Sequence, residues 1–199
     1  MSAPDMSVIA PGFADAPHDS QSVFRAVLEA YAHPGRIVAV PAKLEVPGRL
    51  CLASTAFLLT LVDRETPLWL APELDSPELR DFARFHTGAP LAANRDAASF
   101  AFLTPASEPH FEGFSVGSDS YPDRSATLVV HVPSLSAGPA RRLRGPGIDG
   151  AATAAIAGLP KSFWRDWAAN RALFPCGIDV VFAAGSELLA LPRSIAVEA

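Results

Sequence analysis

The residues of this sequence that could do chemistry are mostly arginines and histidines, which suit the binding of anions. Only Lys43 and Lys161 among its 16 basic residues are lysines. The planar guanidinium of arginine binds carboxylate and phosphate groups through paired hydrogen bonds, although a GC-rich genome would give the same arginine bias. The candidate residues for binding an anion or a partner are Arg25, Arg84, His86, Thr87, Arg142 and Arg144.

The strongest of these candidates also have a plain structural explanation. Arg84 and His86 fall in the last turn of a predicted helix, where the helix dipole favours positive charge. Arg142 and Arg144 alternate along a predicted strand and therefore share one face, about 6.6–7 Å apart. They could hold one anion between them or simply form an exposed strand face. The residue types alone leave both explanations open.

Asp179 and Arg193, near the carboxyl end of the chain, could lie opposite each other in a predicted hairpin. Two apolar runs flank residues 185–187, Gly-Ser-Glu, and this pattern predicts a β-hairpin. A three-residue turn places Asp179 opposite Arg193, whereas a two-residue turn places it opposite Pro192. From the first register we predict a structural ion pair that holds the mouth of the hairpin.

Composition and charge narrow the class of protein. The chain has 199 residues, of which 49% are hydrophobic and 19% charged, as is typical of one globular domain. Its net charge is −5 and no basic block exceeds Arg141-Arg142, so we expect no nucleic-acid partner. The longest apolar run, 56–62, is too short to span a membrane, and no signal peptide is visible. We therefore expect a soluble, cytoplasmic protein.

No metal or cofactor site is predicted. The two cysteines, Cys51 and Cys176, fit no metal spacing or disulfide framework. His131 lies in an apolar run and is interpreted as a hydrogen-bonded core residue rather than a base. Neither Lys43 nor Lys161 stands in a context that predicts the buried amine of a pyridoxal-phosphate enzyme. The dinucleotide-binding, P-loop and common hydrolase motifs are also missing from the sequence.

Helical and strand patterns alternate along most of the chain. Strands are expected at 36–40, 68–71, 99–103, 126–132, 141–144, 178–184 and 188–191. Helices are expected from Ser20 to Pro34 behind Asp19 or Ser20 as cap, over 56–62 behind Ser54 or Thr55, over 77–87 behind Ser76, and after Ser162.

This alternation predicts an α/β protein with three αβα layers and a mixed sheet. Residues 1–19 carry several prolines and no apolar period, and so predict a loosely ordered arm before a single domain at 20–199. Residues 104–125 predict a long connection with room for one helical turn, and loops of that length are often functional or mobile.

Short blocks of the sequence, taken together and in order, resemble a known protein family, although no single block is diagnostic. They run in order from about residue 20 to the carboxyl end: Phe24-Arg25, Pro34-Gly35, 58–63, Thr66-Pro67, Trp69-Leu70, 84–87, Ala89-Pro90, 126–128, Ser134-Leu135, Gly138, Leu143, Gly145, Gly147-Ile148, Phe174-Pro175, 177–179 and Pro192-Arg193. This ordered set resembles PhnH, a subunit family of the bacterial carbon–phosphorus lyase system.

The resemblance implies a role in phosphonate breakdown. PhnH-like subunits work with PhnG, PhnI and PhnL in attaching a phosphonate to ribose C1 of ATP with loss of adenine. The family also implies a homodimer that docks to a PhnI-like subunit, in an assembly with PhnG, PhnJ and PhnL- or PhnK-like subunits. Its fold resembles the large domain of pyridoxal-phosphate (PLP)-dependent transferases without binding PLP. The resemblance carries over no catalytic residue.

Three functions therefore remain, of which the third, a purely structural dimer module, is partly contained in the first. The first is a subunit that supports a ribose 1-methylphosphonate 5-triphosphate synthase and is not catalytic alone, which fits the absence of a self-sufficient catalytic motif. The alternative is a stand-alone enzyme or binding protein for a phosphorylated or phosphonate ligand. In that case the ligand would be held by Arg84, His86, Arg142 and Arg144.

Overall fold

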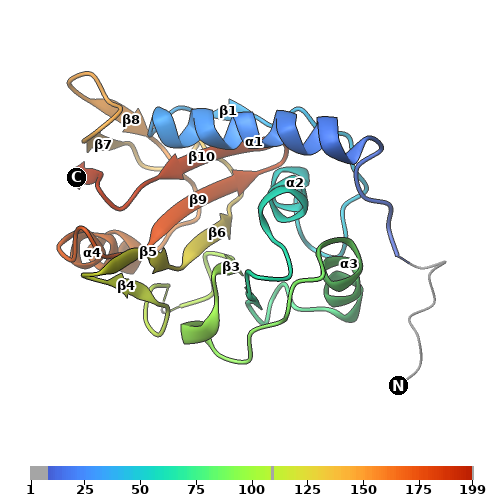
Figure 1. Cartoon of the computed structure of the whole chain (residues 1–199). Helices are drawn as coiled ribbons and strands as arrows, with labels where there is room; N and C mark the ends of the chain where they lie inside the picture. Colours follow the sequence, from blue (N-terminus) through green and yellow to red (C-terminus); the bar gives the residue numbers. More distant parts are fainter. Residues whose placement is uncertain (1–8, 109, 199) are drawn as a thin grey trace.

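A six-stranded mixed sheet runs through the protein, as a computed structural model that describes residues 9–108 and 110–198 shows (Figure 1). The strand order is β1-β10-β9-β6-β3-β2. Four strands are parallel: β2 (Leu68–Leu70), β3 (Phe100–Leu103), β6 (Thr127–His131) and β9 (Asp179–Ala184). The antiparallel members are β10 (Glu187–Leu191) and β1 (Val38–Ala39). The predicted α/β class and mixed sheet are confirmed.

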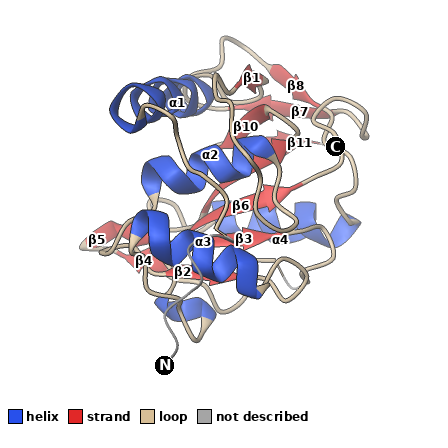
Figure 2. Ribbon diagram, turned by 90° about the vertical axis from the view of Figure 1, so that its right-hand side faces the viewer, coloured by secondary structure: helices blue, strands red, loops and turns tan. Residues whose placement is uncertain are grey.

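Helices lie on both faces of this sheet. Strand side chains alternate between the faces, so Val129 belongs to one core while its neighbours Leu128 and Val130 belong to the other. Figure 2 shows α1, α2 and α3 in front of the strands and α4 behind them. The helices are α1 (Ala16–Ala32), α2 (Leu52–Leu61), α3 (Pro77–Thr87) and α4 (Lys161–Arg171). Within the described residues, none of these helices has the length and hydropathy of a membrane-spanning segment.

A three-stranded sheet, β11-β7-β8, extends the layer that contains α4. Leu143 of β7 and Ala154 of β8 are buried in the same core as Phe163 and Trp167 of α4. The sequence predicts only β7, because β8 and β11 are too short to show an apolar period. The bounds are β7 (Arg141–Arg144), β8 (Ala152–Ala154) and β11 (Ala196–Glu198).

The connection before β6 contains a hairpin where the sequence predicts a helical turn. β4 (Val116–Ser118) and β5 (Tyr121–Ser125) are antiparallel. The Ser118 hydroxyl accepts the Tyr121 amide at 3.2 Å and so closes the turn between the two strands. Gly117 takes a φ of 79° where the register shifts, a bulged conformation that favours glycine. The predicted helical turn is wrong because this local turn chemistry supports a hairpin instead.

Helix α1 begins at Ala16 rather than at Ser20. The Asp15 carboxylate accepts the His18 amide at 3.4 Å, so the predicted cap at Asp19 or Ser20 is wrong. The segment before α1 is also packed, since Ile9 and Phe13 contact the core under α1–α3. The predicted loose arm therefore does not extend through the described residues from 9 onward, and residues 1–8 lie outside the described part of the chain.

Two predicted helix caps lie inside their helices. α2 begins directly after Cys51, and the Thr55 hydroxyl donates to the Cys51 carbonyl at 3.0 Å instead of capping the helix. Ser54 likewise lies in the first turn of α2. In α4 the Ser162 hydroxyl donates to the Glu108 carboxylate, which diverts it from the backbone amides. Serine and threonine commonly bond in this way within a first turn, so sequence alone places a helix start imprecisely.

Candidate functional site

Asp179 and Arg193 form an ion pair at the mouth of the β9–β10 hairpin. Ala184 pairs with Glu187, so the turn has two residues and the predicted three-residue register is wrong. Gly185 takes the positive φ, 54°, that the first position of such a turn needs. Although Asp179 then falls opposite Pro192, Arg193 reaches back, and its backbone amide and Nε donate to the carboxylate at 2.7 and 3.2 Å.

This ion pair is part of a largely buried polar cluster. The side chains of Arg193 and Asp179 are only 16% and 17% exposed. Nη1 of Arg193 donates to the Pro122 carbonyl at 2.8 Å, and the Tyr31 hydroxyl lies beside Thr127 and Asp179. Burial and the charge of Asp179 raise the pKa of Tyr31, which keeps the hydroxyl protonated. The cluster therefore ties α1, β5 and β6 to the hairpin and serves as a structural joint.

Arg142 and Arg144 share one face of β7, as the strand pattern predicts, and both contact a carboxylate of the chain itself. Glu198 of β11 lies 3.8 Å from Nε of Arg142 and 3.3 Å from Nε of Arg144. The three side chains are between 45% and 55% exposed. A single carboxylate between two guanidiniums is the arrangement expected for a bound anion. An external anion would have to compete with Glu198 for this face.

The other predicted binding residues lie on the opposite side of the sheet. His86 Nε2 lies 2.9 Å from the Ala10 carbonyl oxygen, so its ring holds the segment before α1. The Thr87 hydroxyl donates to the Ala83 carbonyl at 2.7 Å within α3. Arg84 and Arg25 are exposed on α3 and α1.

The structure therefore separates the two groups of candidates. Leu79 and Phe82 of α3 pack in one core and Leu143 of β7 packs in the other. Figures 1 and 2 show α3 and β7 well apart in the fold. Arg84 and His86 cannot share one small ligand with Arg142 and Arg144. Anion binding by either group alone stays a prediction.

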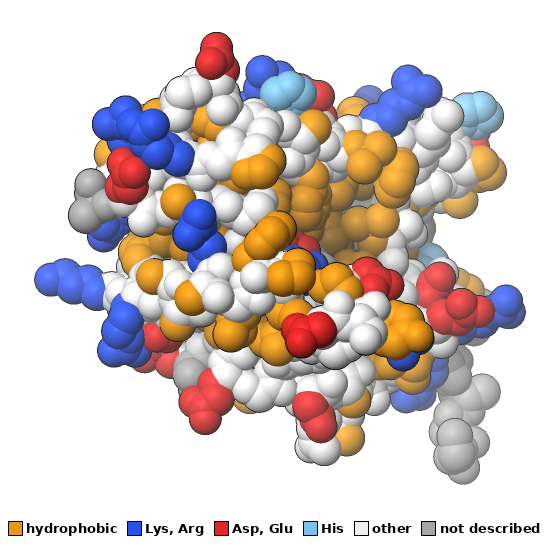
Figure 3. Space-filling view, turned by 60° about the vertical axis from the view of Figure 1, so that its left-hand side comes forward, with side chains coloured by type: hydrophobic (Ala, Val, Ile, Leu, Met, Phe, Trp, Pro, Cys, Tyr) orange, Lys and Arg blue, Asp and Glu red, His pale blue; other side chains and the backbone are white. Residues whose placement is uncertain are grey.

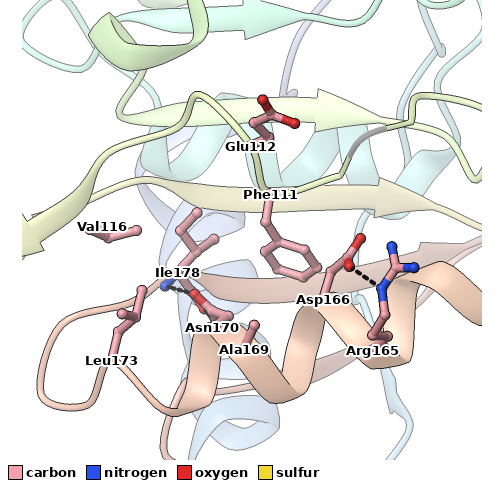
Figure 4. A pocket seen from close by; sticks show the side chains of 9 residues that line it. All are labelled: Phe111, Glu112, Val116, Arg165, Asp166, Ala169, Asn170, Leu173 and Ile178. Atoms are coloured by element: carbon pink, nitrogen blue, oxygen red, sulfur yellow. Dashed lines mark hydrogen bonds and ion pairs between the residues drawn. The ribbon is translucent and has the colours of Figure 1, made fainter.

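A cavity of about 420 Å³ lies between α4 and the chain that precedes β4. In Figure 4 the Phe111 ring points into it between Asp166 and Ile178. Asn170 forms part of its wall, with its carboxamide bonded to the backbone of Ile178. The lining residues are Phe111, Glu112, Val116, Arg165, Asp166, Ala169, Asn170, Leu173 and Ile178. Its mostly apolar wall suits an apolar or aromatic group, and its lining residues include no serine, threonine, cysteine, histidine or lysine.

His110 lies fully buried near this cavity, with its ring centroid 5.1 Å from that of Phe163. Neither ring nitrogen makes a hydrogen bond of normal geometry. Burial lowers the pKa of His110, although the charges of Glu108 and Asp166 oppose this effect. The ring is therefore neutral in the folded protein at neutral pH.

Replacing His110 with leucine should flatten the dependence of stability on pH. The unfolded histidine takes up a proton near its ordinary pKa of about 6.5, whereas the folded one does so only at lower pH. Wild-type stability should therefore fall as the pH drops below about 6.5. H110L should be at least as stable as the wild type at pH 7.5, because no bonded polar group is lost. Urea unfolding at pH 7.5 and 5.5 tests this, and equal losses in both proteins would contradict it.

Cys51 and His131 meet at the edge of the sheet where the parallel strands end. His131, the last residue of β6, lies beside the Cys51 thiol, and each of the two residues shifts the pKa of the other. Burial alone would raise the pKa of Cys51, but the interactions with His131 and Ser54 outweigh it and the pKa is lowered. The interaction with Cys51 raises the pKa of His131. Sequence reasoning missed this pair because the two residues are distant in the chain and follow no motif.

Large apolar side chains remain exposed on the described surface. Figure 3 shows apolar side chains gathered on one face of the molecule, where they line a hollow. Exposed apolar groups that gather in this way are typical of surfaces that bind another protein. The exposed large apolar residues are Phe24, Leu28, Ile37, Val46, Phe85, Tyr121, Leu173 and Phe174.

The sequence matches known proteins along almost its whole length. A family model described as bacterial phosphonate metabolism protein (PhnH) matches residues 11–198. A protein of Rhizobium meliloti (strain 1021), the alpha-D-ribose 1-methylphosphonate 5-triphosphate synthase subunit PhnH, is 43% identical over 187 residues, which cover 94% of each chain. The putative C-P lyase subunit protein HtxG of Stutzerimonas stutzeri is 30% identical over 174 residues, 87% of this chain and 83% of its own. The chain therefore belongs to the PhnH family of bacterial phosphonate metabolism proteins.

Proposed function

We propose that this chain is a subunit of the complex that makes alpha-D-ribose 1-methylphosphonate 5-triphosphate in phosphonate catabolism. The observation that carries the proposal is the 43% identity to a PhnH subunit of that synthase over 94% of both chains. The second relative is described as a putative C-P lyase subunit, so both relatives are described as subunits of enzymes that act on phosphonates. In the proposed reaction a phosphonate oxygen replaces adenine at ribose C1 of ATP.

The chain supports this reaction within the complex rather than performing it alone. Its candidate binding residues lie on both faces of the sheet, so they do not form one substrate site of their own. Arg142 and Arg144 already contact Glu198. The residues that line the cavity beside α4 include no serine, threonine, cysteine, histidine or lysine. A subunit that holds or shapes another subunit's active site accounts for this distribution.

The partners that we propose are other protein subunits. A homodimer that docks to a PhnI-like subunit, in an assembly with PhnG, PhnJ and PhnL- or PhnK-like subunits, would cover the exposed apolar side chains. The net charge of −5 argues against a nucleic-acid partner. The proposed location is the cytoplasm, where ATP is available as the substrate of the complex.

No cofactor is proposed for this subunit, although the fold is proposed to resemble the large domain of PLP-dependent transferases. A Schiff base with PLP needs a lysine in a desolvated pocket. Lys43 and Lys161 are both exposed, which supports a subunit without PLP.

Growth on methylphosphonate tests the proposal. A bacterium that lacks its own PhnH subunit should grow again on methylphosphonate as sole phosphorus source when it expresses this chain, and should grow on phosphate in either case. The Rhizobium meliloti relative is the positive control. Absence of growth while that relative restores it, with this chain folded and expressed, would contradict the proposal.

A separate measurement tests the alternative, that this chain is a stand-alone ligand-binding protein. Calorimetric titration of the isolated chain with ATP and with methylphosphonate should give no binding heat if the complex is needed to complete the site. Saturable heat with either ligand would favour the alternative.

A further inference from the structure

The cavity of about 420 Å³ beside α4 is a groove to which the proposed reaction gives no role. We propose that it is the docking surface for an amphipathic helix of another subunit, with apolar side chains in the groove and acidic side chains against the basic residues of α4. This rests on the proposed function, because it names a surface by which the chain joins the complex. The length of the groove, its exposure to solvent and the charge around it carry the proposal.

The groove follows one side of α4 for about two turns. The residues of this wall, Arg165, Asp166, Ala169, Asn170 and Leu173, recur at the spacing of one side of a helix. From the first to the last of them the chain rises about 12 Å at helical pitch. A helix bound in such a groove inserts apolar side chains at positions i, i+3 or i+4, and i+7. The groove therefore has the length that two or three such side chains need.

The groove is open to solvent along α4, which suits a protein segment better than an enclosed small ligand. Ala169 lies exposed on its rim, and 48% of Leu173 is exposed. The next residue, Phe174, is 62% exposed. The floor is buried and apolar at Ile178. A buried apolar floor with exposed apolar side chains at one end is typical of a surface that another protein covers.

Both walls are held in place before any partner binds. Asn170 ties α4 to the start of β9 through its carboxamide. On the opposite wall the Val116 carbonyl accepts the Gly177 amide at 2.8 Å. Arg95 Nη1 donates to the Glu112 carbonyl of the same wall at 3.1 Å. A groove that is already formed loses little conformational freedom on binding, which favours affinity.

The charge around the groove decides which kind of helix fits it. α4 carries three exposed basic residues, Lys161, Arg165 and Arg171, and one acid, Asp166. Arg165 Nε donates to the Asp166 carboxylate at 2.9 Å, whereas Lys161 and Arg171 form no ion pair within the described residues. Figure 4 shows the carboxylate of Glu112, on the opposite wall, pointing away from α4. In a chain of net charge −5 this helix is a local basic surface, and acidic residues beside an apolar stripe complement it.

Cross-linking identifies the occupant. Ala168→p-benzoylphenylalanine places a photoreactive group on the exposed side of α4, next to the groove. The full chain is assembled with the purified PhnG, PhnI and PhnL subunits of the same bacterium and irradiated, and the cross-linked peptides are identified by mass spectrometry. The expected product is a peptide of another subunit with apolar residues three or four apart among aspartates and glutamates. A product with a second copy of this chain, a basic peptide, or no product in an assembled complex overturns the proposal.

A matched pair of variants tests the groove by affinity. Ala169→Glu puts a carboxylate in the middle of the groove and should weaken binding to the other subunits at least about tenfold. Ala32→Glu is the control and should change the affinity by less than about twofold. Both alanines are exposed in the last turn of a helix, so an added acid has a similar effect on folding. Circular dichroism checks both variants, and equal affinities of the two overturn the proposal.

Reversal of the basic charges tests the acidic character of the partner. Lys161→Glu, Arg165→Glu and Arg171→Glu together should weaken binding at least about tenfold at low salt, and the difference from the wild type should shrink as salt is added. Arg64→Glu, at an exposed arginine before β2, should have little effect. Wild-type affinity of the triple variant overturns the proposal. A wild-type chain that fails to assemble at all contradicts the proposed function itself, and the docking surface falls with it.

Discussion

Replacing Arg193 with methionine should destabilise the protein by about 3 kcal/mol, because it removes one partner of a largely buried ion pair. The Asp179 carboxylate would keep its bond from the amide of residue 193, at 2.7 Å, but would lose the guanidinium. The Pro122 carbonyl would lose its donor as well. Urea unfolding of the variant and the wild type at pH 7 measures the difference.

Arg144→Met is the matched control for this substitution. Arg144 also pairs with a carboxylate, but its side chain is 45% exposed, compared with 16% for Arg193. Exposed ion pairs contribute about 0–1 kcal/mol, so this variant should unfold at nearly the wild-type urea concentration. Equal losses in the two variants would contradict the structural role assigned to the Asp179–Arg193 pair.

Replacing Asn170 with alanine should cost about 2–4 kcal/mol, because it leaves buried polar groups of the backbone without partners. The Asn170 carboxamide donates to the Ile178 carbonyl at 2.9 Å and accepts the Ile178 amide at 2.8 Å. These two bonds join α4 to the start of β9 (Figure 4). No other side chain of the described residues satisfies both groups. Thermal and urea unfolding measure the loss.

Two further variants separate this hydrogen-bonding role from simple packing. Asn94→Ala removes an exposed asparagine whose side chain caps nothing, and it should change stability by less than about 0.5 kcal/mol. Asn170→Asp keeps the acceptor for the Ile178 amide but places a charged oxygen against the Ile178 carbonyl. Its stability should improve on mild acidification, when the carboxyl group can donate again. An N170A variant as stable as the wild type would show that the bonds to Ile178 are not needed.

Local rules explain which parts of the fold the sequence predicts well. α3 begins behind Ser76, whose hydroxyl accepts the Leu79 amide at 3.2 Å, and it ends at Gly88 in the left-handed conformation. Both positions follow from neighbouring residues alone. The start of α1 could not be found in this way, because Asp15 and Asp19 are both good caps and the packing of Ile9 and Phe13 selects the first.

The candidate site depends on contacts between distant residues, and these the sequence predicts only in part. The Asp179–Arg193 pair was predicted from a register that the hairpin does not have, and it forms because an arginine side chain is long enough to reach across one position. Glu198 could not be assigned to Arg142 and Arg144 without β11. The contact between Cys51 and His131 depends on the order of strands in the sheet, which no local pattern encodes.

The function follows from the family rather than from a visible reaction centre. The blocks that carry the resemblance include turns, helix ends and core positions. Residues 84–87, for example, form the end of α3 before Gly88, and Asp179 and Arg193 lie at the mouth of the hairpin. These residues determine the local fold of the chain rather than form a reaction centre. Under the proposed function, this fold contributes to the reaction only within the assembled complex.

The release of adenine by the reconstituted complex tests the central claim most directly. PhnG, PhnI and PhnL subunits of one organism are purified with and without this chain, ATP and methylphosphonate are added, and free adenine is quantified by chromatography. The proposed function predicts adenine release that depends on methylphosphonate and falls at least tenfold when this chain is omitted. Release at the same rate without the chain would contradict the claim that it is a subunit of the synthase.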